Sequence, residues 1–218
     1  MNPSPKPAIA RIIKISSKKI EEGKVRSIAR VLRDGEVIVY PTDTFYGLGG
    51  DCFSVQALQR IYRIKKRVPR RPFPVLISDV HMVKDLATEV PVALKALAAR
   101  FWPGPLTLVL RAAAGFPAEL VGANRTIGIR LPNVAWLREL IRRVGFPIIA
   151  TSANISGAGE IDSAEEVIRQ FQDKVDLIVD GGRTPGGRPS TVVDLTGETP
   201  VFLREGAISK EEIQSFLF

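Results

Sequence analysis

Short hydroxyl and amide side chains recur where predicted strands run into loops, and cationic side chains accompany them along the chain. The hydroxyl and amide group comprises Thr42, Thr44, Thr126, Ser152, Asn154, Ser156 and Ser190. The cationic group comprises Lys65, Arg67, Arg71, Arg130 and Arg204. Such groups are suited to positioning a ligand and to stabilising negative charge on phosphate. This is the chemistry of phosphoryl and nucleotidyl transfer.

Residues for covalent or metal-based catalysis are scarce. The chain has one histidine, His81, which falls in an expected surface helix and argues against a serine–histidine–aspartate triad. Its one cysteine, Cys52, excludes an intramolecular disulfide, argues against cysteine metal sites and fits a reducing cytoplasm. No G-x-x-x-x-G-K-[ST] P-loop is present. We therefore expect no metal ligands from the side chains.

The stretch from Val37 to Asp51 is the first of the strand-to-loop junctions. Val37 to Tyr40 are β-branched or aromatic residues and predict a buried strand, which Pro41 ends because it has no N–H to donate. A glycine-rich loop after a strand is where open α/β sheets bind ligands, although an irregular loop without function has the same pattern. The glycines that would let the backbone approach a ligand are Gly47, Gly49 and Gly50.

A run of positive charge follows a predicted helix that begins after Ser54. Seven basic residues lie between positions 60 and 71 without an acidic one: Arg60, Arg63, Lys65, Lys66, Arg67, Arg70 and Arg71. Such a run is either a solvated helix face or a binding site for a polyanion. The repulsion between these charges at a helix end favours the polyanion site.

The segment from Thr126 to Arg130 predicts a strand with two different faces. Its period of two places Thr126, Gly128 and Arg130 on one face, and Ile127 and Ile129 on the core face. A gap beside an arginine fits a small ligand with a carboxylate, because a guanidinium binds carboxylates through two hydrogen bonds. The alternative is an edge strand with one solvated arginine.

Strands and helices alternate along all 218 residues, and no linker divides them. We expect an α/β or mixed α+β fold over residues 1–218, a single domain with a twisted mixed β-sheet flanked by helices. Residues 1–7 are expected to form a flexible arm. No segment has the length and apolar character of a membrane span or signal peptide. The net charge of +8 suggests a polyanionic partner.

Five motifs in order resemble those of the YrdC-type threonylcarbamoyl-AMP synthases, in their short, single-domain branch. The resemblance extends from about residue 10 to residue 210 and adds to the physical interpretation above. The motifs are Y-P-T-D-T-F-Y-G-L-G at 40–49, K-K-R at 65–67, F-W-P-G-P-L-T at 101–107, T-S-A-N-I-S-G at 151–157, and S-T-V-V-D at 190–194 followed by L-R-E-G-A at 203–207.

The resemblance implies a YrdC-like fold with an open basic cleft and a cytoplasmic enzyme. The family condenses L-threonine, bicarbonate and ATP into L-threonylcarbamoyladenylate and releases pyrophosphate. Partner proteins then transfer the threonylcarbamoyl group to tRNA. ATP is thus expected as a substrate, with Mg²⁺ as a helper.

The resemblance also implies roles for individual residues. Those expected to hold L-threonine are Thr44, Arg130, Ala150 and Ser190. Those expected to bind ATP are Arg67, Arg71, Thr126, Ser152 and Arg204. Those expected to act in catalysis are Lys65, Arg67, Ser152 and Asn154. Three positions depart from the usual family pattern: Arg71, Leu76 and Pro189.

Two alternatives remain open at the level of the sequence. One is a module that binds double-stranded RNA or tRNA without synthase activity, which the basic run and the net charge would support. The other is a relative that acts on a different carbamoyl acceptor, against which the absence of acylphosphatase-like and zinc-finger segments argues.

Overall fold

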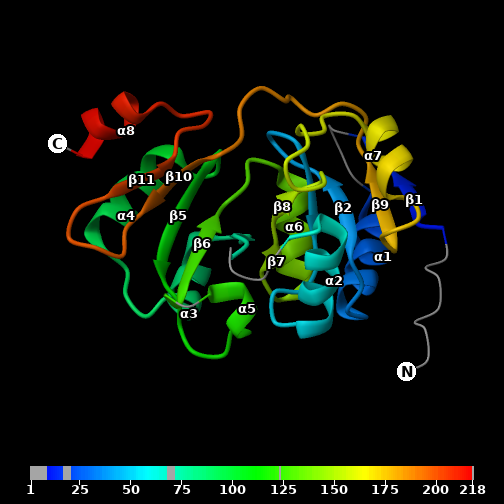
Figure 1. The fold of residues 1–218 in the computed structure, drawn as a ribbon, viewed down its shortest axis with the longest axis horizontal. Coiled ribbons are helices and arrows are strands. Elements are labelled where there is room, and N and C mark those ends of the chain that lie inside the picture. Colours follow the sequence, from blue (N-terminus) through cyan, green and yellow to red (C-terminus); the bar gives the residue numbers. More distant parts are fainter. Residues whose placement is uncertain (1–8, 17–20, 68–71, 123, 218) are drawn as a thin grey trace.

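The chain forms two mixed β-sheets with helices packed against them (Figure 1). The computed structural model describes residues 9–16, 21–67, 72–122 and 124–217. The expected mixed α/β class is confirmed, with the strands divided over two sheets rather than gathered in one. None of the helices in these ranges has the length and apolar character to cross a membrane.

The five-stranded sheet contains the strand predicted at Val37 to Tyr40. In order across the sheet, its strands are β1 (Arg11–Lys14), β9 (Leu177–Asp180), β2 (Ile38–Pro41), β3 (Tyr46–Gly49) and β8 (Thr151–Ser152). Strands β1, β9 and β2 are parallel, whereas β3 is antiparallel to both β2 and β8. All four residues of β2 are buried, as expected for a strand covered on both faces.

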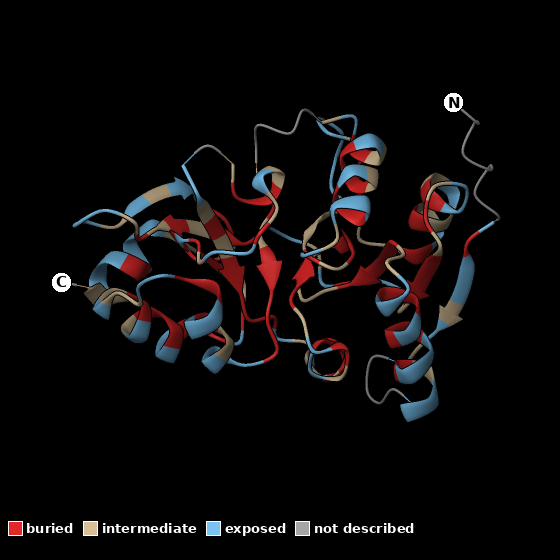
Figure 2. Cartoon of the chain, turned by 90° about the horizontal axis from the view of Figure 1, so that it is seen from below, coloured by how far each residue is buried: buried red, intermediate tan, exposed pale blue. Residues whose placement is uncertain are grey.

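Helices cover both faces of this sheet. Tyr40 and Ile38 of β2 share one core cluster with Ile28 and Leu140, whereas Val39 points into the other cluster. Burial therefore follows the inner faces of the helices (Figure 2). The helices are α1 (Glu22–Arg33) and α6 (Ala135–Val144) on one face, and α2 (Val55–Lys65) and α7 (Ala164–Phe171) on the other.

The six-stranded sheet has one apolar face and one face with polar groups. Leu108 on β5 and the predicted core residues Ile127 and Ile129 on β6 are fully buried in one cluster with Leu97 of α4 and Ile213 of α8. The strands, in order, are β11 (Val201–Arg204), β10 (Thr191–Asp194), β5 (Leu106–Arg111), β6 (Thr126–Arg130), β4 (Val75–Leu76) and β7 (Ile148–Ile149).

The helices beside the six-stranded sheet are mostly short. The longer two are α4 (Val92–Phe101) and α8 (Lys210–Leu217), which contact each other. The others are η1 (Val80–Met82), α3 (Val83–Leu86) and α5 (Ala118–Val121). The expected helix at His81 is therefore a short 3₁₀ turn, in which His81 is exposed.

The predicted glycine loop after β2 is wrong in part, because Tyr46–Gly49 forms strand β3 and pairs with β2. A Cβ atom on Gly49 would lie 2.0 Å from the carbonyl oxygen of Ile149, and one on Gly47 would lie 2.9 Å from the ring of Tyr40. The two glycines thus allow other parts of the protein to pack closely, rather than serving only to admit a ligand.

Candidate active site

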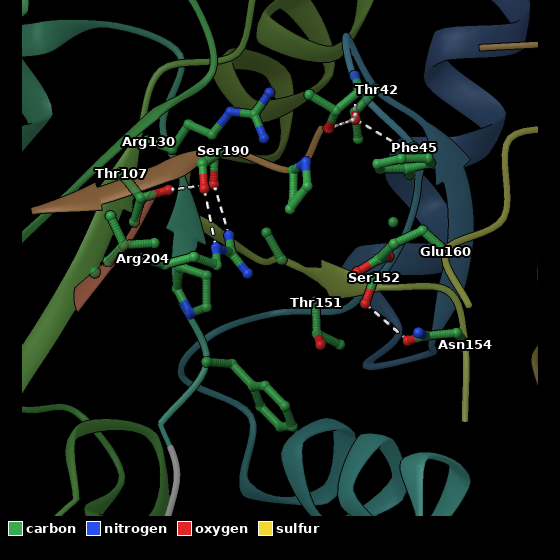
Figure 3. Close-up of a pocket in the computed structure, with 18 of the residues that line it drawn as sticks. Thr42, Phe45, Thr107, Arg130, Thr151, Ser152, Asn154, Glu160, Ser190 and Arg204 are labelled. Atoms are coloured by element: carbon green, nitrogen blue, oxygen red, sulfur yellow. Dashed lines mark hydrogen bonds between the residues drawn. The ribbon is translucent and has the colours of Figure 1, made fainter. Parts of the chain in front are cut away.

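A cavity of about 880 Å³ lies between the polar face of the six-stranded sheet and the β2–β3 hairpin (Figure 3). Its lining on β6 comprises Thr126, Gly128 and Arg130, which confirms that these three residues share a face opposite Ile127 and Ile129. The gap at Gly128 is narrow, since a Cβ there would lie 3.2 Å from both Pro74 and Thr107. The volume suits a ligand the size of a nucleotide.

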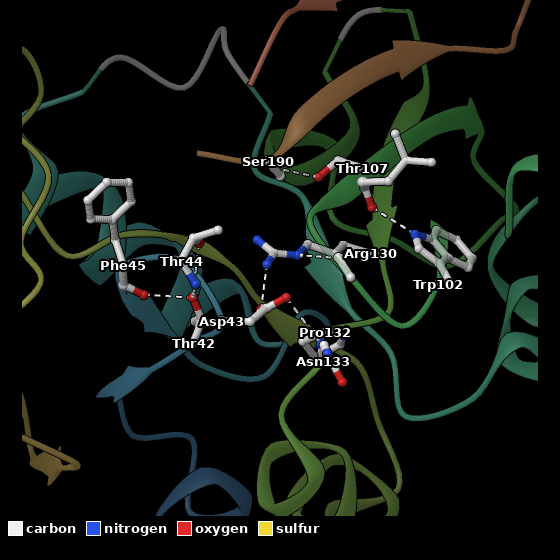
Figure 4. A network of polar contacts seen from close by, with 12 residues as sticks. Thr42, Asp43, Thr44, Phe45, Trp102, Thr107, Arg130, Pro132, Asn133 and Ser190 are labelled. Carbon is white, nitrogen blue, oxygen red and sulfur yellow. Dashed lines mark hydrogen bonds and ion pairs between the residues drawn. The ribbon is translucent and has the colours of Figure 1, made fainter. Parts of the chain in front are cut away.

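Arg130 lies at the end of β6 and is held by two acceptors (Figure 4). Its Nε donates to the carbonyl oxygen of Gly104 at 3.1 Å, and its Nη2 forms an ion pair of 2.5 Å with Oδ1 of Asp43. The other carboxylate oxygen of Asp43 accepts a hydrogen bond of 3.2 Å from the backbone N–H of Asn133. Arg130 is therefore a buried and oriented cation rather than a solvated one.

Thr44 lies across the cavity from the sheet, in the turn of the β2–β3 hairpin. Its hydroxyl is 3.1 Å from that of Thr42, which also accepts from the Thr44 N–H at 3.1 Å and donates to the carbonyl oxygen of Phe45 at 2.7 Å. The carbonyl oxygen of Thr44 accepts from the N–H of Gly186 at 2.8 Å. The turn is thus fixed by hydrogen bonds to its own residues and to a distant loop.

Ser190 directly precedes β10 and forms hydrogen bonds with residues of the two neighbouring strands, β5 and β11. Its hydroxyl is 2.9 Å from that of Thr107 and accepts from Nη2 of Arg204 at 3.1 Å. Nε of Arg204 donates to the Ser190 carbonyl oxygen at 3.0 Å. The two contacts orient the planar guanidinium toward the cavity that Arg204 lines, as Figure 3 shows.

Lys65 is the last residue of α2 and is only 3% exposed. Its ammonium donates to the Ser152 carbonyl oxygen at 2.7 Å and to Oδ1 of Asn154 at 2.7 Å. The Ser152 hydroxyl donates to the same Oδ1 at 2.7 Å, and the Asn154 amide donates to the Ala158 carbonyl oxygen at 2.7 Å. The interpretation of the basic run as a solvated face is therefore wrong for Lys65.

The charges around Lys65 are unbalanced. The pKa of Lys65 is lowered to about 8, chiefly by burial, with Glu160 opposing this shift and Arg67 adding to it. Desolvation similarly lowers the pKa of Arg204. Arg67 also lies over the ring of Phe73, with 4.9 Å from the guanidinium carbon to the ring centroid. The cavity therefore holds cations whose charge an anionic ligand would stabilise.

The structure brings the predicted site residues to one cavity wherever it describes them. Those that line it are Thr44, Lys65, Arg67, Thr126, Arg130, Ala150, Ser152, Asn154, Ser190 and Arg204. Leu76 and Pro189, which depart from the family pattern, line it as well. Arg71 lies outside the described residues. Arg60, at the start of the basic run, instead pairs with Asp176 and takes no part in the site.

Three residues of this region were missed by sequence reasoning. Thr107 contacts Ser190, Glu160 lines the cavity near the cations, and Asp43 holds Arg130. Thr107 and Asp43 lie within motifs quoted above, so their position was a usable signal. Glu160 follows a glycine in a loop, where the sequence offered no signal for a role in the site.

Acidic side chains that could hold a metal ion are few in the described part of the cavity. Within the described ranges, no group of three or more histidine, cysteine, aspartate or glutamate side chains converges. Glu160 is an acidic residue of the lining, and Asp43 is taken up by Arg130. This set fits a Mg²⁺ ion held chiefly by the phosphates of a nucleotide and by water, the usual manner for this ion.

Comparison with known proteins identifies the class to which this fold and cavity belong. The family model Sua5_yciO_yrdC, described as "Telomere recombination", matches residues 30–206. The chain therefore belongs to the Sua5/YciO/YrdC family.

Several curated relatives carry the name threonylcarbamoyl-AMP synthase, among them the following two. The one from Pyrococcus abyssi is 40% identical over 199 residues, which cover 91% of this chain and 58% of the relative. The one from Bacillus subtilis is 38% identical over 195 residues, which cover 89% of this chain and 56% of the relative. The chain thus spans little more than half the length of these relatives.

Solved structures show the same fold. P. abyssi Sua5 in complex with L-threonine matches with a TM-score of 0.90 at 40% identity, over 94% of this chain and 60% of that one. Escherichia coli YciO matches with a TM-score of 0.87 at 29% identity, over 94% of this chain and all of that one. The family fold is therefore present over nearly the whole chain.

Proposed function

We propose that this protein is an L-threonylcarbamoyladenylate synthase, a nucleotidyltransferase that condenses L-threonine, bicarbonate and ATP. One observation carries the proposal: a single cavity joins a small polar corner to a group of cationic side chains. Thr44, Arg130 and Ser190 form the corner, and Lys65 and Arg204 belong to the cationic group. The names of the two curated relatives and the L-threonine complex of P. abyssi Sua5 support the assignment.

The small corner is assigned to L-threonine. Arg130 would bind the α-carboxylate, because a guanidinium matches its two oxygens. Thr44 and Ser190 are neutral hydrogen-bonding groups, and Ala150 leaves space beside them. Neutral groups suit this reaction, since the threonine amine must lose its proton to become a nucleophile.

The cationic group is assigned to the triphosphate. The amine attacks the carbon of the bicarbonate unit with loss of water, and an oxygen of the resulting carbamate attacks the α-phosphorus while pyrophosphate leaves. Lys65, Arg67 and Arg204 would neutralise the charge on the leaving pyrophosphate. Thr126 and Ser152 would hydrogen-bond the nucleotide, with Asn154 positioning Lys65 and Ser152. Arg71 completes the proposed ATP-binding set.

Other components of the reaction are part of the same proposal. Mg²⁺ would enter with ATP and share the charge of the phosphates. The product would pass to partner proteins that transfer the threonylcarbamoyl group to tRNA. The net charge of +8 favours a polyanionic partner of this kind.

The test is to incubate the purified protein with ATP, Mg²⁺, bicarbonate and labelled L-threonine. Labelled adenylate and pyrophosphate are expected in equal amounts. R67A should lose most of this activity, whereas R63A should retain it, because Arg63 is an exposed residue of the same basic run and does not line the cavity. Wild-type protein that forms no more product than R67A would contradict the proposal.

A further inference from the structure

The ion pair between Asp43 and Arg130 joins the two sheets. Asp43 lies in the turn between β2 and β3 of the five-stranded sheet, whereas Arg130 ends β6 of the six-stranded sheet. The two side chains are only 12% and 9% exposed. Both carboxylate oxygens are engaged, one by Arg130 and one by the N–H of Asn133. The carboxylate thus connects the hairpin to the polar face and to the segment after β6 (Figure 4).

Asp43 lies behind the cavity rather than in it. Thr44 and Arg130 line the cavity, but Asp43 does not. Of the three guanidinium nitrogens, Nε and Nη2 have acceptors, and Nη1 has none among the described residues. Nη1 and the second N–H of Nη2 therefore remain for the two oxygens of a ligand carboxylate.

We propose that Asp43 is the positioning residue of the amino-acid corner. This inference rests on the proposed function and deepens it. Asp43 fixes the direction of Arg130, and it also sets the spacing between Arg130 on one sheet and Thr44 on the other. A guanidinium that is already oriented loses little freedom when the substrate carboxylate arrives. The carboxylate achieves this from behind, where it does not hold the reactive amine as an ammonium ion.

The substitution D43N tests the negative charge of Asp43, because asparagine has nearly the same shape. Asparagine keeps an acceptor for Arg130 but removes the negative charge, so charge-assisted binding is lost. We expect KM for L-threonine to rise about tenfold or more and KM for ATP to stay within about twofold, because the nucleotide does not depend on Arg130. D43E keeps the charge and is expected to restore most of the threonine affinity, both in KM and in direct calorimetric titration with L-threonine.

D176N is the matched control. Asp176 also forms an ion pair with an arginine, Arg60, but away from the cavity. Its loss is expected to lower the melting temperature without separating the two KM values. On an R130A background, D43N should cause no further loss of threonine binding, since Asp43 acts through Arg130.

The outcomes separate the two proposals. An active wild type in which D43N raises both KM values alike, or in which D43E is as weak as D43N, overturns the role of Asp43. A wild type that binds L-threonine in calorimetry but forms no adenylate overturns the proposed function, while the titrations with D43N and D43E still decide the role of Asp43. An insoluble D43N leaves the decision to D43E, whose threonine KM should then rise less than about threefold.

Discussion

The ammonium of Lys65 lies 2.7 Å from the amide oxygen of Asn154, although the two residues are 89 positions apart in the chain. Its second acceptor, the carbonyl oxygen of Ser152, is also uncharged. Two neutral acceptors orient a buried cation without cancelling its charge. Lys65 is therefore oriented for an anionic ligand, and its protonation should depend on whether that ligand is bound.

ATP binding is expected to take up a proton near pH 8. The pKa of Lys65 is about 8 in the free protein, and phosphate oxygens beside the ammonium would raise it. ATP affinity should consequently fall as the pH rises above 8. Calorimetric titrations at one pH in two buffers with different ionisation heats would measure the uptake, which K65M should lack. Equal proton uptake by wild type and K65M would contradict the assignment.

The stability of the unliganded protein should also depend on pH through Lys65. The folded pKa of Lys65, about 8, lies below its ordinary value of 10.5, so between these pH values the unfolded chain binds more protons. The contribution of Lys65 to the free energy of unfolding therefore rises with pH across this window, by on the order of 1–3 kcal/mol.

Urea denaturation of wild type and K65M between pH 7 and 10 would measure this effect as a difference. The comparison is needed because burial raises the pKa of the Tyr40 hydroxyl, which makes stability fall at the alkaline end in both proteins. The free energy of unfolding of K65M should therefore fall relative to that of the wild type as the pH increases. A pH-independent difference would show that Lys65 stays charged.

Replacement of Arg204 by lysine is expected to weaken ATP binding. An ammonium cannot make both contacts that Arg204 makes with Ser190, one to the carbonyl oxygen and one to the hydroxyl. We expect R204K to raise KM for ATP about tenfold, roughly the loss of one charge-assisted hydrogen bond. R111K is the control, because Arg111 is exposed and contacts Thr196 outside the cavity. A similar effect of both substitutions would argue against a specific role.

Gly49 is expected to tolerate no side chain. A Cβ atom would lie 2.0 Å from the Ile149 carbonyl oxygen, so β3 or β7 would have to move. G49A should lower the free energy of unfolding by about 2–4 kcal/mol. G23A is the opposite control, because nothing lies within 4 Å of Gly23 in helix α1, and a gain of up to about 1 kcal/mol is expected. Urea denaturation would measure both changes in the free energy of unfolding, and unchanged m-values would show that the unfolding transitions are comparable.

The sequence predicted which residues of a strand face the core better than it distinguished loops from strands. Residues 126–130 alternate cleanly, so Ile127 was expected in the core and Arg130 on the polar face, as observed. Strand β3 was not predicted, because two of its four residues are glycine. Glycine weakens a strand and is found there mainly where another group packs closely against the backbone. That close packing comes from Tyr40 and Ile149 and is visible only in three dimensions.

Long-range pairing explains the other errors. Lys65 was one of several basic residues in a run, and its burial depends on Ser152 and Asn154, far along the chain. Asp43 and Arg130 are likewise 87 positions apart, so their ion pair has no local pattern. The described residues that the motif resemblance indicated line one cavity, but the resemblance did not indicate which of them hold one another in place.

Ala150 alone separates β7, in the six-stranded sheet, from β8, in the five-stranded sheet. From Ile149 to Ser152 the backbone spans at most about 11 Å, which ties the two sheets covalently beside the cavity. An insertion of one residue here would shift β7 or β8 in register and turn its side chains to the opposite face. A reporter peptide is better inserted at Gly197 to Thr199, an exposed loop between β10 and β11, where added length leaves both sheets in register.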